Sequence, residues 1–174
     1  MEPDPRTKVD LAEQYELAIK VRDDVSTLSG VVQQLRAVRK QLADRNELLG
    51  EDKKYADIRK ASKELIKKLS TLEEKLHNPK AKVVYDIFGP KGGAMLYSQL
   101  VFIYSTLQDG DGPPTQGVQN VYKDMSTRLS QLVEEFKTLT TKDLVQLNDD
   151  AKKLELPTVF VPAVKPNKKP PKGT

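Results

Sequence analysis

The feature that most restricts the fold is a long run of apolar residues at helical spacing in the first third of the chain. Its members recur every three or four residues, so they lie on one face of an α-helix, close to a heptad seam. The run opens at Asp10, with Glu13 placed as in a capping box, and ends before Gly50. The seam is Leu11, Tyr15, Ala18, Val21, Val25, Leu28, Val32, Leu35, Val38 and Leu42. A single helix of this length would extend roughly 58 Å.

Gly30 interrupts this seam and lowers the helix propensity by about 1 kcal/mol relative to alanine. Two interpretations are open. The glycine marks a close helix crossing or a bend, or it is simply tolerated within the helix.

A second amphipathic segment follows after a short connection around Gly50. Its apolar face is Tyr55, Ile58, Ala61, Leu65, Leu69, Leu72 and Leu76. Lysine and glutamate occupy the other faces, and Asn78-Pro79 ends the helix because proline disfavours helical geometry in the residue before it. The short connection predicts that the first two helices are antiparallel neighbours.

Residues 79–92 break the helical pattern with a short apolar, β-prone run that ends at Gly89-Pro90, and they predict a packed loop covering the end of the bundle. A third helix is expected from about Gly93 to Leu107, followed by a Gly/Pro turn over residues 109–114.

Thr115 is the expected N-cap of a fourth helix. Its seam continues through Val118, Tyr122, Met125, Leu129, Leu132, Phe136 and Leu139. At Thr140-Thr141 the helix either continues or breaks, and the apolar period then resumes at Leu144.

These segments predict an all-α protein: an antiparallel up-down bundle of about four helices, with a long first helix. The predicted organisation is an extended lead over residues 1–9, the bundle over 10–156, and a Pro/Lys-rich tail over 157–174. Residues 159–161 are apolar enough to lie on the bundle, whereas Pro162–Thr174 is expected to be disordered or extended.

The basic charge of the chain resides in this tail. The net charge is +4, and the last ten residues contain four lysines and no acid, so the remaining 164 residues are neutral. A nucleic-acid-binding domain concentrates positive charge on its folded surface, so we expect no nucleic-acid partner. We also expect no membrane span, because no apolar run approaches the length that a bilayer requires. The N-terminus is polar and lacks the pattern of a signal peptide.

No residue pattern predicts catalysis, a cofactor site or a metal site. The chain has no cysteine and one histidine, His77, which we interpret as a cation at a helix C-terminus. Glu74-x-x-His77 occurs once, whereas di-iron bundles need that pair twice. Gly89–Gly93 lacks the Walker spacing, and Asp109–Gly112 lacks the rest of a calcium loop. The paired acids Asp23-Asp24 and Asp149-Asp150 have basic neighbours and predict solvated faces.

Several short stretches occur in an order that resembles the C-terminal helical region of large bacterial proteins with sortilin-type (BNR-repeat) β-propellers. Such proteins are commonly labelled glycosyl hydrolases or exo-sialidase-like. The resemblance covers roughly residues 4–162 and departs from the expected pattern after Pro79. The stretches are Asp4–Arg6, Val9–Leu11, Leu17–Val25, Val38–Leu42, Leu107–Thr115 and Asp143–Asn148.

The resemblance implies a non-catalytic accessory module at the end of an exported propeller protein, with any hydrolase site in the propeller. The implied partner is that parent β-propeller, and the implied location is periplasmic or extracellular. The alternative is a free-standing helical protein that self-associates or binds a partner helix, because helices two to four are too short to cover the first helix completely.

Overall fold

The computed structural model describes residues 5–78, 93–110 and 112–164, with side chains described from residue 11 onward. All regular structure in these residues is helical, which confirms the predicted all-α class. The elements are α1 (Pro5–Leu49), the 3₁₀ turn η1 (Lys53–Tyr55), α2 (Ala56–Leu76), α3 (Leu96–Asp109), α4 (Gln116–Thr138), the π-helical segment η2 (Leu139–Asp143) and α5 (Leu144–Lys153).

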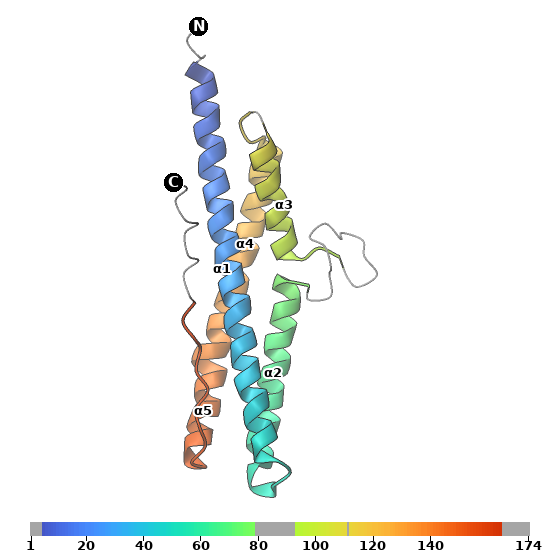
Figure 1. The fold of residues 1–174 in the computed structure, drawn as a ribbon, viewed down its shortest axis with the longest axis vertical. Coiled ribbons are helices and arrows are strands. Elements are labelled where there is room, and N and C mark those ends of the chain that lie inside the picture. The colour runs from blue at the N-terminus through green and yellow to red at the C-terminus, as the bar shows by residue number, and fades with distance from the viewer. Residues whose placement is uncertain (1–4, 79–92, 111, 165–174) are drawn as a thin grey trace, which may run out of the picture.

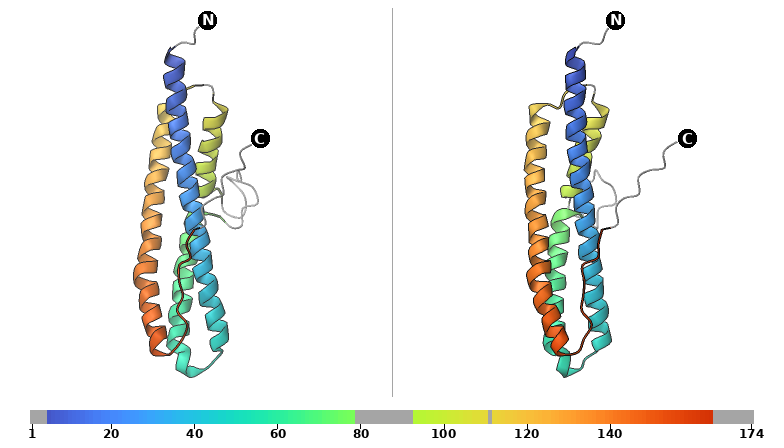
Figure 2. Two further views of the ribbon diagram at one scale, coloured as in Figure 1. Left: turned by 60° about the vertical axis from the view of Figure 1, so that its left-hand side comes forward. Right: turned by 90° about the vertical axis from the view of Figure 1, so that its left-hand side faces the viewer.

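The helices form an up-down bundle whose successive legs alternate in direction (Figure 1). The long helix α1 forms the first leg, and α2 and α3 run back along it, stacked end to end. The third leg is α4, η2 and α5, which run in the same direction as α1. Helix α1 contacts α2, α3 and α4, so these three helices pack against it. In one half of the molecule α3 lies beside α1 and α4, and in the other half α2 lies beside α1 and the rest of the third leg (Figure 2).

The core follows the predicted seams. Leu28, Leu35 and Leu42 of α1 are fully buried, as are Leu69 and Leu72 of α2. Removing apolar area of this kind from water is the main stabilising term of a bundle, at roughly 25 cal/mol per Å². The other fully buried apolar side chains, scattered through α1, α2, α3 and α5, are Val21, Val38, Leu76, Leu96, Leu100 and Ala151.

The start of the first helix differs from the prediction. Helix α1 begins at Pro5, so residues 5–9 are helical and the expected extended lead over 1–9 is wrong for them. Proline suits the first helical position because its missing N–H would have no partner there in any case. The capping pattern at Asp10 and Glu13 therefore lies inside the helix.

Two predicted boundaries are confirmed. Gly50 has φ +55, the left-handed conformation that ends helices and that glycine adopts without strain. Thr115 caps α4, because its hydroxyl oxygen accepts a hydrogen bond from the backbone N–H of Val118 at 3.3 Å. The predicted connection around Gly50 contains a 3₁₀ turn that Asp52 caps through the Lys54 amide.

The fourth helix continues through Thr140-Thr141 rather than breaking. The backbone widens there into the five-residue π segment η2. The hydroxyl groups of Thr140 and Thr141 donate to the carbonyl of Lys137, which satisfies backbone acceptors in this turn. A π turn adds one residue to a helix and keeps the chain helical, so the parts of the seam before and after η2 both still face the core.

The predicted loop over residues 79–92 lies outside the described residues. The residues on either side of it meet halfway along the bundle, where Asn78 donates to the carbonyl of Gly93 at 3.2 Å (Figure 1). Here α2 ends and α3 begins.

The first part of the predicted tail is ordered. Residues 157–164, called the strap below, run back along α1 from the end of α5 (Figure 2). Val159 is 5% exposed and joins the core, which confirms that this region lies on the bundle. The tail after residue 164 is outside the described residues. The bundle therefore extends beyond the predicted boundary at residue 156.

Candidate functional site

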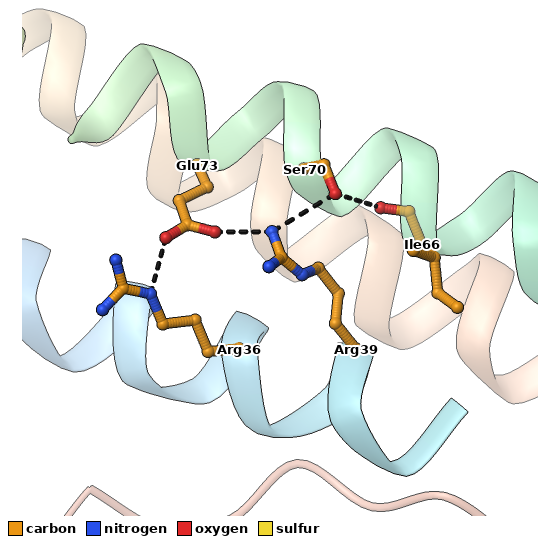
Figure 3. A network of polar contacts seen from close by, with 5 residues as sticks. All are labelled: Arg36, Arg39, Ile66, Ser70 and Glu73. Atoms are coloured by element: carbon orange, nitrogen blue, oxygen red, sulfur yellow. Dashed lines mark hydrogen bonds and ion pairs between the residues drawn. The ribbon is translucent and has the colours of Figure 1, made fainter. Parts of the chain in front are cut away.

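The most buried ionic group is a carboxylate between α1 and α2 (Figure 3). Glu73 is 4% exposed, and its two oxygens accept hydrogen bonds from Arg36 and Arg39 at 2.5 Å each. Arg39 also donates to Ser70, whose hydroxyl donates to the carbonyl of Ile66. Both carboxylate oxygens are engaged by guanidinium groups, so the network joins two helices and offers no free base.

His77 lies at the junction of α2 and α3, where its ring contacts Tyr97 edge to face at 5.5 Å. Burial, and then the positive charge of Arg36, hold the pKa of His77 below its usual value. The lowered pKa favours the neutral imidazole, which argues against the sequence interpretation as a helix-terminal cation. Nδ1 is buried and has no hydrogen-bond partner among the described residues.

Among the described residues the structure brings together no constellation suited to metal binding. The part of the chain that is described contains no group of three or more His, Cys, Asp or Glu side chains placed to share an ion. Glu74, the partner in the single Glu-x-x-His pattern, is exposed to solvent. Of the Gly89–Gly93 run, only Gly93 is described.

The paired acids mostly interact with their own neighbours, as expected for solvated faces. Asp23 pairs with Arg22 at 2.7 Å, and Asp150 pairs with Lys153 at the same distance. Asp24 is different, because it accepts a hydrogen bond from the Tyr122 hydroxyl at 2.9 Å and so links α1 to α4.

Helix α1 holds the predicted turn after α3. The side-chain amide of Gln14 donates to the carbonyl of Gly110 at 2.7 Å and to the carbonyl of Leu107. These bonds satisfy acceptors that the end of α3 leaves free. Asp111, which belonged to the calcium-like pattern, lies outside the described residues.

An apolar groove of about 490 Å³ lies between α3 and α4 and is called the α3/α4 groove below. No charged residue lines it, and Val121 at its rim is 47% exposed. The lining residues are Ala94, Ser98, Gln99, Phe102, Ile103, Thr106, Thr115, Gly117, Val118, Val121 and Met125. Groove surfaces of this kind bind apolar partners because a buried charge has no counterpart there to compensate its lost hydration.

The sequence around this groove is unusual for the chain. Between Gly93 and Tyr122 there is no lysine or arginine, and the acids are Asp109 and Asp111 alone, although 31% of the whole chain is charged. The sequence reasoning missed these residues, and the gap in charge is the signal that identifies them. Protein interfaces are depleted of charge at their centres in the same way.

Comparison with known proteins gives no relative. No family model, no curated protein and no solved structure matches the chain. Within the described residues, none of the helices combines the length and the apolar character that crossing a bilayer requires.

Proposed function

We propose that this chain is a non-catalytic helical module that binds a helix of a partner protein in the α3/α4 groove. The observation that carries the proposal is the uncharged lining of that groove in a chain of which 31% of the residues are charged. A surface of this composition favours burial against another protein.

The shape of the groove supports a helical occupant. Its lining on α3 extends from Ser98 to Thr106, a length of about 12 Å or just over two helical turns. In this half of the molecule the described helices α1, α3 and α4 contact one another. A partner helix lying between α3 and α4 would complete a four-helix bundle and would bury its own apolar stripe.

The family resemblance suggests where that partner comes from. In the resembled proteins the helical region follows a β-propeller in one exported chain, so the parent propeller protein is the proposed source of the partner helix and this region is an accessory module. Reading the coding sequence upstream of Met1 tests this first. An in-frame propeller supports the accessory role, whereas a stop codon directly before Met1 contradicts it.

If a propeller is found, the two parts can be expressed as separate chains and co-purified. We expect Val121→Glu to abolish co-purification, because it places a charge at the rim of the groove. The exposed Gln119→Glu substitution on the same helix is the matched control and should leave binding unchanged. Equal binding by both variants would show that the α3/α4 groove is not the contact surface.

A specific observation also supports the free-standing alternative, in which the chain self-associates. Helix α1 projects beyond the turn between α3 and α4 (Figure 1), and its seam residues Leu11 and Tyr15 are 52% and 68% exposed. The bundle leaves this part of the seam uncovered, as the sequence predicted. Sedimentation over a dilution series should show an oligomer that Leu11→Glu weakens. A constant monomer mass for the unchanged chain would contradict self-association through this seam.

A further inference from the structure

The strap is bound by side-chain amides that recognise its backbone. Asn148 of α5 donates to the carbonyl of Val159 at 2.8 Å and accepts from the amide of the same residue at 2.9 Å. Gln41 of α1 makes the same pair of bonds with Phe160, at 2.9 and 3.1 Å. Two helices thus hold consecutive strap residues through both backbone polar groups.

This pattern is the one that an extended peptide requires. Backbone groups of successive residues in an extended chain point to opposite sides, here toward α5 at Val159 and toward α1 at Phe160. The side chains alternate as well, since Val159 is 5% exposed and Phe160 is 65% exposed. Recognition therefore depends on an extended backbone and one buried β-branched side chain.

Contacts with α1 continue along the whole strap. The buried guanidinium group of Arg45 donates to the carbonyl of Pro157, and Gln34 donates to the carbonyl of Pro162. The end of the strap lies over Gly30, where an added Cβ would be 3.1 Å from a methyl carbon of Val164. From Arg45 to Gly30 the helix rises about 22 Å, and seven extended residues cover about the same length. The strap thus matches the length of the part of α1 between Arg45 and Gly30.

The hinge that leads into the strap is strained. Glu155 has φ +58, a left-handed conformation that is unfavourable for a residue with a side chain. Glycine usually occupies this position after a helix, where the backbone turns back on itself. Short strained hinges favour the exchange of the following segment between two copies of a protein, since opening the hinge relieves the strain.

We propose that the groove between α1 and α5 is a binding site for an extended peptide, and that the strap of a second copy of this chain is its ligand in trans. Two copies then exchange their straps and retain every contact described above. The proposal concerns a different surface from the α3/α4 groove and does not depend on it. A cavity of about 370 Å³ beside the start of the strap, lined by Gln41, Arg45 and Pro157 among others, shows that this groove is not closed around its occupant.

In the unchanged protein the strap of the same chain competes with a second copy. A short tether gives that competitor an effective concentration in the mM range, so exchange in the unchanged protein requires high concentration. A test must therefore remove the competing strap while it leaves the groove intact.

The experiment mixes two full-length variants. Val159→Asp places a charge in the buried position and disables the strap, but its groove is intact. Gln41→Ala combined with Asn148→Ala disables the groove, but its strap is intact. In the mixture each working strap has only the groove of the other variant to occupy. We expect a heterodimer by analytical ultracentrifugation, at concentrations where each variant alone and the unchanged protein are monomeric.

A mixture that stays monomeric over the whole dilution series, with both variants helical by circular dichroism, would overturn the proposal. Dimerisation of the Val159→Asp variant by itself would also overturn it, because association would then not need the strap. Should Val159→Asp fail to fold, Phe160→Pro serves instead. It removes the N–H that donates to Gln41 and changes a side chain exposed to solvent. Adding Val121→Glu to both partners should not affect the heterodimer, which separates this result from the proposed function.

Discussion

The carboxylate of Glu73 on α2 lies 2.5 Å from the guanidinium group of Arg39 on α1, with Arg36 at the same distance from its other oxygen. The carboxylate side chain is 5% exposed, whereas those of Arg36 and Arg39 are 48% and 31% exposed. The acid is therefore the buried member, and each arginine keeps part of its hydration. A buried charge with two partners fixes how two helices meet, because any slip of one helix along the other would leave the charge unpaired.

We expect Glu73→Ala to lower the free energy of unfolding by about 1–3 kcal/mol, less than for a fully buried pair because water reaches both arginines after the change. Urea unfolding followed by circular dichroism measures this difference. Glu74→Ala is the matched control, because Glu74 is the exposed neighbour, and it should change stability by less than about 0.5 kcal/mol. Equal effects of the two substitutions would contradict the assigned role.

Gly30 and Val164 form a second testable pair. Alanine in place of a helical glycine normally stabilises by about 1 kcal/mol, but here the new Cβ would lie 3.1 and 3.3 Å from two methyl carbons of Val164. We expect Gly30→Ala to raise the free energy of unfolding by less than this in the unchanged chain. The increase should reach the full amount when Val164→Ala is also present. A double-mutant cycle in thermal unfolding should give a coupling of about 0.5–1 kcal/mol. Additive effects would show that the strap does not approach Gly30.

The sequence predicted the helices well because each seam depends only on local spacing. Helix α1 continues through Gly30, in agreement with the interpretation of a tolerated glycine, but the residue is also buried against the strap. That contact could not be read from the sequence, because Gly30 and Val164 are brought together only after two legs of the bundle have packed. The same holds for Gln41 and Phe160, which are 119 residues apart.

The end-to-end stacking of α2 and α3 was not predicted for a related reason. The direction of α3 relative to α2 depends on the connection through residues 79–92. No periodic pattern in the sequence encodes this direction. By contrast, the π segment did leave a local signal. Leu139 and Leu144 are five residues apart, although every other gap in this seam is three or four residues. An additional residue at that point requires either a break or a wider turn.

Tyr122 predicts how stability changes at alkaline pH. Burial, and then the hydrogen bond to Asp24, raise the pKa of Tyr122 to about 12, whereas the unfolded chain releases this proton near pH 10. The folded state therefore holds the proton more tightly, so the stabilisation is complete below pH 10 and is lost as the pH rises through about 12. We expect the unchanged protein to lose more stability over this interval than Tyr122→Phe does.

Below pH 10 the Tyr122→Phe variant should be less stable by about 1 kcal/mol, because it lacks the hydrogen bond to Asp24. Urea unfolding at several alkaline pH values measures both effects. Tyr15→Phe, which changes a tyrosine that is 68% exposed, controls for the general effect of losing a phenol. Parallel stability curves for Tyr122→Phe and the unchanged protein would disprove the role of this hydrogen bond.

The π segment predicts an unusual tolerance of deletion. Removing Thr141, which is exposed, would shorten the gap between Leu139 and Leu144 from five residues to four. The helix could then close into regular α geometry with both halves of the seam still facing the core. We expect the free energy of unfolding to change by less than about 1 kcal/mol, since only the exposed threonine and its hydrogen bond to the Lys137 carbonyl are lost.

Deleting Lys137 is the matched control, because this residue is also exposed but lies in regular helix. Its removal turns Leu139 by about 100° relative to Phe136 and out of the core, because the π turn that can close to compensate lies after that position. The cost should exceed about 2 kcal/mol, as for the loss of a buried leucine. Thermal unfolding of the two deletion variants compares them directly. If the Thr141 deletion is as damaging as the Lys137 deletion, the additional residue at η2 is required for the register of α5, and the seam does not continue through it as the structure indicates.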